Sequence, residues 1–102
     1  MLTNIIKLLD GKNISIKEVV FKTCGHKNFL HLSLEMLSVE YLLVCENVSA
    51  LKIDATCFPL NIDIAIIDNK QSGWDKSVRY HIYDYENNNI NFYCSDIHFL
   101  KH

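Results

Sequence analysis

The sequence has few of the residues that interrupt secondary structure, with 3 glycines and 1 proline among 102 residues. Flexible linkers and low-complexity tracts are rich in such residues, so we expect residues 1–102 to form a single domain. Long apolar runs are also missing, since none approaches the roughly 20 residues that cross a bilayer as a helix. We therefore expect no membrane association.

An excess of basic residues is absent as well: 10 Lys and Arg stand against 12 Asp and Glu, a formal net charge of -2. Proteins that bind nucleic acid through its phosphates normally carry clustered Lys and Arg. The composition therefore argues against a nucleic-acid partner. From Phe58 onward acidic residues outnumber basic ones, which suits either a basic protein partner or an ordinary solvated surface.

The cysteines also lack a functional pattern. They are Cys24, Cys45, Cys57 and Cys94, each in or beside an apolar run, and none belongs to a C-x-x-C pair. Residues 1–9 lack the small-residue cleavage site of a secretory signal, so we expect a cytoplasmic protein whose thiols are reduced and mostly buried. Cys94 shares the phase of Ile90 and Phe92, which predicts an inert core thiol.

A metal site would have to come from Cys24, His26 and His31, which lie close together in the sequence. Zinc sites need three or four converging ligands, usually in paired spacings that are missing here. The pattern predicts a turn with a buried cysteine and an exposed histidine. We expect neither a metal nor another cofactor.

The sequence does contain stretches in which apolar and polar residues alternate. In the stretch 73–99, Val78, Tyr80 and Ile82 alternate with more polar residues, as do Ile90, Phe92 and Cys94. A period of two is typical of half-buried strands. The residues between them, Glu86–Asn89, tolerate the backbone angles of a short turn. The stretch therefore predicts a β-hairpin.

The same pattern recurs along most of the chain. A short helix is expected at Leu2–Leu9, where apolar residues have helical spacing and Asp10–Gly11 follows. The expected strands are Ile14–Thr23, Leu30–Met36, Glu40–Glu46, Leu51–Ala55, Leu60–Ile66, Val78–Tyr83 and Ile90–Phe99. About seven short strands without intervening helices indicate an all-β, mainly antiparallel fold, a meander closed as a sandwich or a barrel.

Three strands carry further detail. The apolar phase changes at Lys17–Glu18, which predicts a bulge. Glu40–Glu46 is apolar at successive positions, which predicts a central strand covered on both faces. The last strand changes phase near Ser95–Asp96, so that Ile97 and Phe99 return to the core.

The best candidate site is the outward face of the predicted hairpin. It would present Arg79, His81, Tyr83 and Tyr85 from one strand, and Asn91 and Tyr93 from the other. Tyrosine and arginine are enriched at interface hot spots, although an exposed sheet face with ordinary aromatic pairs would show the same residues. Asp63, Asp84 and Glu86 could meet basic groups of a partner.

Asp84 and Glu86 form the other polar pair of this hairpin. Two carboxylates can divide acid and base roles in catalysis, or they can bind turn amides and Arg79. Asp84 shares the core phase, and a buried carboxylate needs hydrogen-bond donors. We expect a structural role, with the Trp74 indole and amides of the loop 68–76 as donors.

Several short segments resemble a known group of proteins: Glu46–Val48, Phe58–Pro59, Gly73–Trp74, Arg79–Tyr80, Asp84–Asn87 and Ile90–Cys94. Their order is similar to small proteins of low-GC Gram-positive bacteria, some of which look like immunity proteins encoded beside polymorphic or cell-wall-associated toxins. The resemblance covers about half of the chain. It implies a cytosolic, non-enzymatic protein that binds one toxin, often a nuclease, and it defines no binding motif.

Three functions follow as hypotheses. The first is a non-catalytic domain that neutralises a toxin by binding it through the tyrosine-rich face. The second is a small-molecule-binding barrel with an apolar cavity. The third is an enzyme that uses Asp84 and Glu86. Exposed edge strands would also allow a homodimer.

Overall fold

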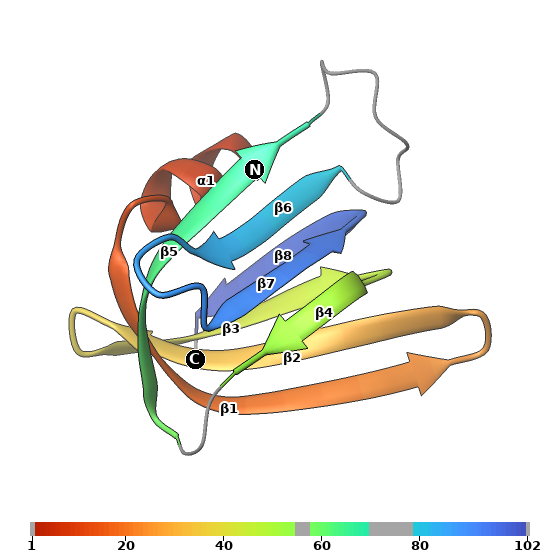
Figure 1. Ribbon diagram of the computed structural model, residues 1–102, viewed down its shortest axis with the longest axis horizontal. Helices are drawn as coiled ribbons and strands as arrows, with labels where there is room; N and C mark the ends of the chain where they lie inside the picture. Colours follow the sequence, from red (N-terminus) through yellow and green to blue (C-terminus); the bar gives the residue numbers. More distant parts are fainter. Residues whose placement is uncertain (1, 55–57, 70–78, 102) are drawn as a thin grey trace.

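The computed structural model describes residues 2–54, 58–69 and 79–101, and in them one helix and eight strands (Figure 1). The helix α1 spans Leu2–Leu9, as predicted. The strands are β1 (Asn13–Cys24), β2 (Lys27–Met36), β3 (Val39–Glu46), β4 (Ser49–Ile53), β5 (Leu60–Asp68), β6 (Tyr80–Asp84), β7 (Ile90–Cys94) and β8 (Asp96–Lys101). The expected all-β, mainly antiparallel fold class is confirmed.

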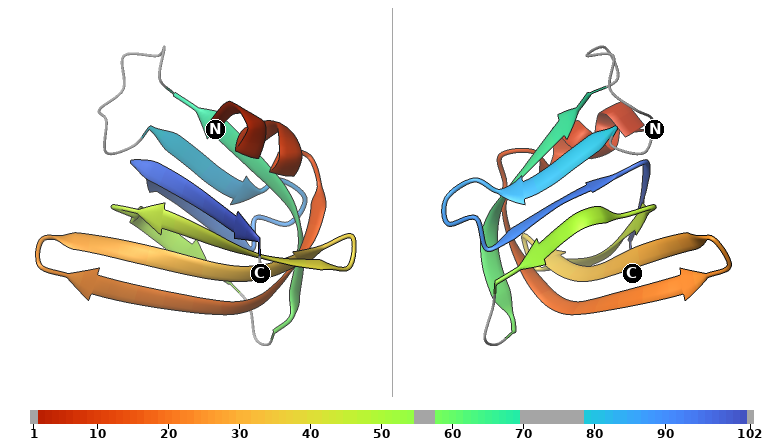
Figure 2. Two further views of the ribbon diagram at one scale, coloured as in Figure 1. Left: turned by 180° about the vertical axis from the view of Figure 1, so that it is seen from behind. Right: turned by 45° about the vertical axis from the view of Figure 1, so that its right-hand side comes forward.

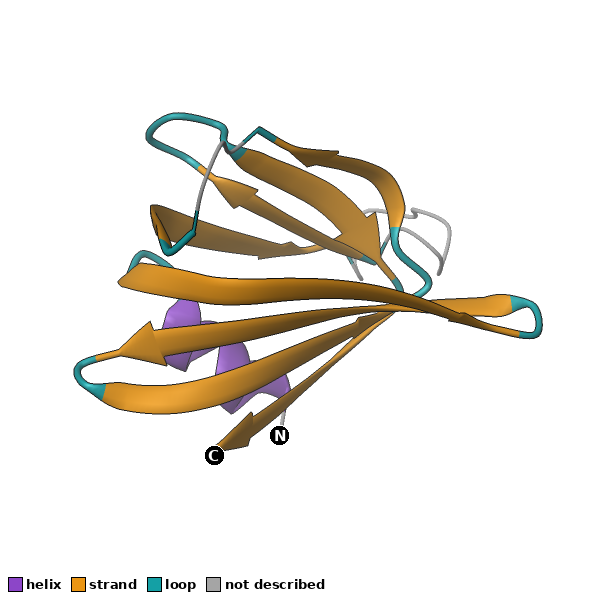
Figure 3. Cartoon of the chain, turned by 90° about the horizontal axis from the view of Figure 1, so that it is seen from below, coloured by secondary structure: helices purple, strands orange, loops and turns teal. Residues whose placement is uncertain are grey.

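The strands form one sheet in the order β4–β7–β6–β5–β1–β2–β3–β8, and the paired strands are antiparallel. β5 joins the two halves, because its residues 60–63 pair with β1 and its residues 64–68 pair with β6. The sheet curls over so that its halves lie as two layers, which Figure 3 shows from below. Since β4 and β8 end the strand order, the described part is an open two-layer sandwich.

The core lies between these layers and consists of the inward residues of the alternating strands. The buried side chains include Leu30, Leu32, Leu34 and Met36 of β2, Ile62, Ile64 and Ile66 of β5, and Ile82, Ile90 and Phe92 of β6 and β7. All of these positions have the phase that the sequence predicted. Burial of apolar side chains is the main term that stabilises such a fold.

The helix α1 contacts β5 and β8 and packs on the core beside them (Figure 2). Leu9 is fully buried, and Ile6 packs against the same apolar cluster. The helix ends where Gly11 takes a φ of 79°, a left-handed conformation that glycine adopts without steric cost. Asp10 ties this end to β5, since its Oδ1 accepts a hydrogen bond from Ile66 N at 2.9 Å. In the described part of the chain, no helix is long and apolar enough to cross a membrane.

The predicted bulge in β1 is confirmed, because the pairing with β2 shifts between Ile16 and Glu18. Two other strand predictions need correction. Only one face of β3 is buried: Leu43 is inaccessible, whereas Leu42 and Val44 are half-buried, since no layer formed by the described residues covers the outer face. In β4, the register shifts near Ala50 and leaves Leu51 39% exposed rather than in the core.

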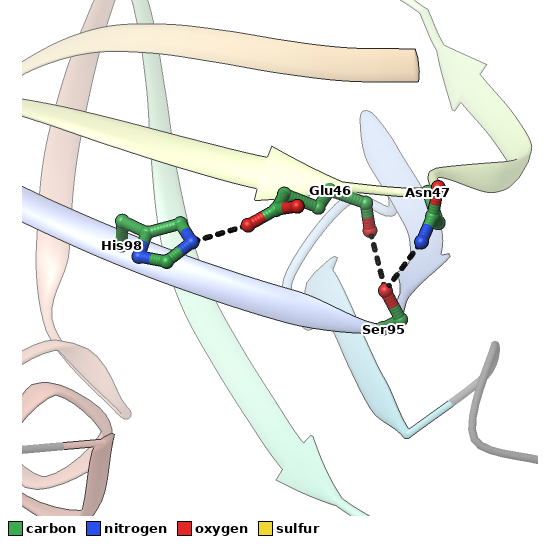
Figure 4. Close-up of polar contacts among 4 residues, drawn as sticks. All are labelled: Glu46, Asn47, Ser95 and His98. Carbon is green, nitrogen blue, oxygen red and sulfur yellow. Dashed lines mark hydrogen bonds and ion pairs between the residues drawn. The ribbon is translucent and has the colours of Figure 1, made fainter. Parts of the chain in front are cut away.

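The chain crosses between the layers twice at one corner, after β3 at Asn47 and after β7 at Ser95 (Figure 4). Asn47 has a φ of 54°, which asparagine tolerates better than most residues. Its Nδ2 donates to Ser95 Oγ at 2.9 Å, and Ser95 N donates to the carbonyl of Glu46 at 2.9 Å. Asn28 of β2 supports the corner by accepting from Val48 N at 2.6 Å. The break at Ser95 divides the last predicted strand into two, in different layers, so the number of strands is eight rather than about seven.

Candidate functional site

The outward side of the hairpin β6–β7 carries a cluster of aromatic and amide side chains, which we call the tyrosine face. It consists of His81 and Tyr83 of β6 together with Asn91 and Tyr93 of β7. In the register, His81 lies opposite Tyr93 and Tyr83 lies opposite Asn91. All four are half-buried, while the residues that alternate with them are buried in the core. The sequence prediction thus placed these four residues together correctly.

His81 is the centre of the tyrosine face. Its ring stacks on Tyr93, with centroids 4.4 Å apart, and on Tyr83, with centroids 4.7 Å apart. Its Nε2 lies 2.8 Å from Asn91 Oδ1, which orients the imidazole when that nitrogen carries the proton. Because the cluster lies on paired strands and each ring supports the next, its shape is fixed before any partner is met.

The face extends sideways onto β5. Ala65 lies opposite Tyr83, and Ile67 lies opposite His81. Ile67 is 43% exposed, so it adds apolar surface beside the rings. The result is a strip of side chains across neighbouring strands, apolar in its body and with polar groups at its tips. Such mixed surfaces are common at protein interfaces.

Arg79 directly precedes β6, and its side chain is bound by other residues of the same chain. Its Nε and Nη2 donate to the two carboxylate oxygens of Asp68 at 3.3 and 3.4 Å, and its guanidinium lies 4.8 Å from the ring centroid of Tyr80. The hydrogen bond to Asp68 raises the pKa of Arg79 above its usual value. The expected alternative, a bridge from Arg79 to Asp84 or Glu86, is wrong, because Asp68 of the neighbouring strand is the partner.

The remaining predicted contact residues lie at the opposite end of the hairpin. Tyr85 is 50% exposed, and its backbone N–H donates to the carbonyl of Asp63 at 3.1 Å. The Asp63 side chain accepts a hydrogen bond from Asn13 Nδ2 at 3.1 Å. Glu86 is exposed in the turn. Tyr85, Asp63 and Glu86 therefore form a more acidic end beside the tyrosine face.

Asp84 is buried, as its phase predicted, and is 1% exposed. Its Oδ1 accepts hydrogen bonds from the backbone amides of Asp63 at 3.3 Å and Glu86 at 3.2 Å, and its Oδ2 accepts from Asn89 at 3.3 Å. The donors among the described residues thus come from β5 and from the hairpin turn, and residues 70–76 of the loop that was expected to supply amides lie outside the described residues. Trp74, the other expected donor, lies outside the described residues. A carboxylate enclosed by turn amides cannot reach a substrate, which disfavours Asp84 and Glu86 as a catalytic pair. For the same reason, the expectation that Asp84 meets basic groups of a partner is wrong.

Tyr80 is a residue that the sequence reasoning treated only as apolar. Its side chain is fully buried, and its hydroxyl has no hydrogen-bond partner among the described residues. Burial raises the pKa of Tyr80, because the phenolate would lose its hydration. The alternation predicted the buried ring, but no local pattern shows whether a hydroxyl finds a partner.

A second polar group, which the sequence analysis did not identify, lies at the corner shown in Figure 4. His98 Nε2 contacts a carboxylate oxygen of Glu46, and the Ser95 hydroxyl donates to the Glu46 carbonyl at 3.3 Å. Serine nucleophiles need a base in contact with the hydroxyl. Here the hydroxyl is bound by a carbonyl and by the Asn47 amide, while the imidazole binds a carboxylate. These residues stabilise the corner and do not form a catalytic arrangement.

The cysteines differ in exposure. Cys45 and Cys94 are fully buried, and burial, followed by a hydrogen bond with Cys94, raises the pKa of Cys45. Cys24 is exposed at the end of β1, so the expectation of a buried thiol in that turn is wrong. Cys57 lies outside the described residues. Within the described ranges, no group of three His, Cys, Asp or Glu side chains could hold a metal ion.

A small open pocket of about 160 Å³ lies away from the tyrosine face. Its lining comes from three strands of the other layer: Lys17, Ser33, Leu34, Glu40 and Tyr41. It is therefore not the cavity lined by inward Ile, Phe and Tyr side chains that a small-molecule-binding barrel would need.

No protein-family model, curated protein or solved structure matches this chain. The fold and the tyrosine face are thus the observations from which a function can be inferred.

Proposed function

We propose that this protein is a non-enzymatic, cytoplasmic domain that binds another protein through the tyrosine face. The partner in this proposal is a bacterial toxin, which the protein neutralises as an immunity protein. The observation that carries the proposal is the stack of His81 with Tyr83 and Tyr93. Aromatic anchors that are ordered before binding lose little conformational entropy on association, and they dominate the energetics of many interfaces.

The surroundings of the stack support the same use. Ile67 adds exposed apolar area on one side, and Asp63 and Glu86 add acidic groups near the far end of the hairpin. Opposite charges at the rim of an interface accelerate association and select partners, so a basic surface fits best. A toxin that acts on nucleic acid needs a basic surface for its substrate. The acidic end would compete for that surface.

The test is co-expression with the protein encoded directly upstream, where the toxin of an immunity protein is expected. The toxin alone should arrest growth, and co-expression with this chain should restore growth. Purified, the two should form a complex measurable by calorimetry. Replacing Tyr83 and Tyr93 by alanine should weaken binding at least about tenfold per residue, as truncation of aromatic anchors commonly does.

Leu100→Ala is the matched control, because Leu100 is 56% exposed on β8 in the other layer. This variant should bind like the wild type. Equal binding by all three variants would remove the tyrosine face as the contact. Absence of both growth rescue and complex formation would remove the immunity function.

A further inference from the structure

The second half of β1 is a free sheet edge. β5 pairs with β1 only at Asn13–Ile16, whereas β2 pairs with it as far as Cys24. From Glu18 to Cys24, no described strand pairs with the other side of β1. In Figure 1 the tip of the β1–β2 hairpin extends beyond β4 of the second layer. Alternate N–H and C=O groups of this stretch therefore point away from β2 without a strand to pair with.

This edge carries two charged residues, Glu18 and Lys22, but lacks the other usual features that prevent pairing with another chain. Protected edges are short, or carry charges, bulges or prolines. Here the bulge comes earlier, between Ile16 and Glu18, and the following residues pair with β2 without a further shift. The sequence there is rich in strand-forming residues, Val19, Val20 and Phe21, and contains no Gly or Pro before Gly25. Phe21 is 49% exposed, so an apolar ring lies at the edge.

The edge is also complementary to itself. We infer that two copies of this chain pair their β1 edges antiparallel about a two-fold axis at Val20, with Glu18 of each copy opposite Lys22 of the other. In this register Val20 meets the partner's Val20 and Val19 meets the partner's Phe21. Each pair from Glu18 to Lys22 then joins apolar with apolar or acid with base, which are the cross-strand pairs that stabilise sheets.

Shifted registers lose this match. An axis at Val19 places Glu18 opposite Val20, and an axis at Phe21 places Val20 opposite Lys22, so neither register joins the two charges. Glu18 and Lys22 have no ion pair or hydrogen bond from their side chains to other described residues, whereas the nearby Lys17 is engaged by Glu35 at 3.4 Å. Glu18 of one copy is thus available to pair with Lys22 of a second copy.

The inferred dimer leaves the tyrosine face on a different layer, so it is independent of the proposed function. It would join two β1–β2 hairpins into one continuous sheet and cover Phe21 of each copy. An interface made mainly by one strand pair is small, so the association should depend on concentration.

The test is the molar mass in solution, measured by sedimentation equilibrium from about 5 µM to about 500 µM with reductant to prevent bridging through Cys24. The mass of the wild type should rise from 11.9 kDa toward twice that value. E18K and K22E each place like charges opposite one another in both pairs. Each should weaken the dimer at least about tenfold.

The decisive experiment mixes the two variants, since both charged pairs in a mixed dimer again join opposite charges. An equimolar mixture should therefore form heterodimers, and the double variant E18K/K22E should dimerise like the wild type. Amide hydrogen exchange should slow at residues 18–24 as concentration rises. A monomer at all concentrations, which would leave the edge for a strand of another protein, overturns the inference. A dimer indifferent to the charge reversals overturns it as well.

Discussion

His81 and Tyr93 stack across the pair β6–β7, with centroids 4.4 Å apart and ring planes 15° apart. They lie directly opposite each other in the register, so the stack is a cross-strand pair on the outward face of a hairpin. Because Tyr83 stacks on His81 as well, the imidazole connects two tyrosines that would otherwise move separately. The stack thus contributes both to the stability of the hairpin and to the order of its surface.

His81→Ala should therefore destabilise the protein by about 1–2 kcal/mol, because it removes two ring contacts and the hydrogen bond to Asn91. Urea unfolding followed by circular dichroism measures the change. A double-mutant cycle with Tyr93→Ala should give a coupling of about 0.5–1.5 kcal/mol.

The matched control for this substitution is His31→Ala. His31 is a half-buried outward histidine of β2, and its side chain has no ring contact or hydrogen bond among the described residues. Its replacement should change the free energy of unfolding by less than about 0.5 kcal/mol. Equal losses at both histidines would show that the stack adds nothing beyond ordinary packing.

Asp84→Asn should destabilise the protein by about 1–3 kcal/mol, because both carboxylate oxygens accept from backbone amides. An asparagine amide group keeps one acceptor oxygen and places a donor against another donor at the second position. Chemical denaturation at neutral pH measures the loss. Glu86→Gln, the same type of change two residues away in the exposed turn, should alter stability by less than about 0.5 kcal/mol. An unchanged Asp84→Asn variant would mean that these amides do not depend on the carboxylate.

These residues also show how much of the candidate site can be predicted from the sequence. Alternation alone placed Asp84 inward and His81, Tyr83, Asn91 and Tyr93 on one outward face, because strand geometry fixes which side each residue takes. It did not identify the partners of Asp84. The donors Asp63 and Asn89 come from another strand and from the exact path of the turn, which depend on tertiary pairing rather than on local pattern.

The wrong predictions for β3 and for the last strand have a related physical origin. Strand β3 is apolar on both faces, and an apolar run does not reveal whether a second layer covers it; the outer face of this layer is left half-buried. The two crossings at Asn47 and Ser95 depend on hydrogen bonds between residues 48 positions apart. The sequence indicated a phase change near Ser95, but it did not indicate that the chain passes into the other layer there.

Tyr80→Phe should stabilise the protein by about 1 kcal/mol at neutral pH, because it removes a buried hydroxyl that has no partner among the described residues. Burial raises the pKa of Tyr80 in the folded state, so folded Tyr80 stays protonated where the unfolded chain ionises near pH 10. The sign follows from linkage: the wild type loses stability as pH rises above about 10, and the phenylalanine variant lacks that contribution.

Denaturant titrations at pH 7 and at about pH 10.5 measure this difference, and the advantage of Tyr80→Phe should be larger at the higher pH. Tyr85→Phe is the control at neutral pH, since Tyr85 is 50% exposed and its hydroxyl is accessible to water. It should change stability by less than about 0.5 kcal/mol. A loss of stability in Tyr80→Phe would show that the hydroxyl does make a bond that stabilises the fold.

Thiol reactivity should separate the cysteines by exposure. Cys24 is exposed, whereas Cys45 and Cys94 are fully buried, so neither buried sulfur is accessible, and the raised pKa of Cys45 further disfavours its thiolate. Labelling with N-ethylmaleimide, located by peptide mass spectrometry, should modify Cys24 at least about a hundredfold faster than Cys45 or Cys94, which react only through opening of the fold. In denaturant, all three should react at similar rates. Rapid native labelling of Cys45 would mean that the two layers separate readily at that corner, and the packed core described for β3 and β7 would then be wrong.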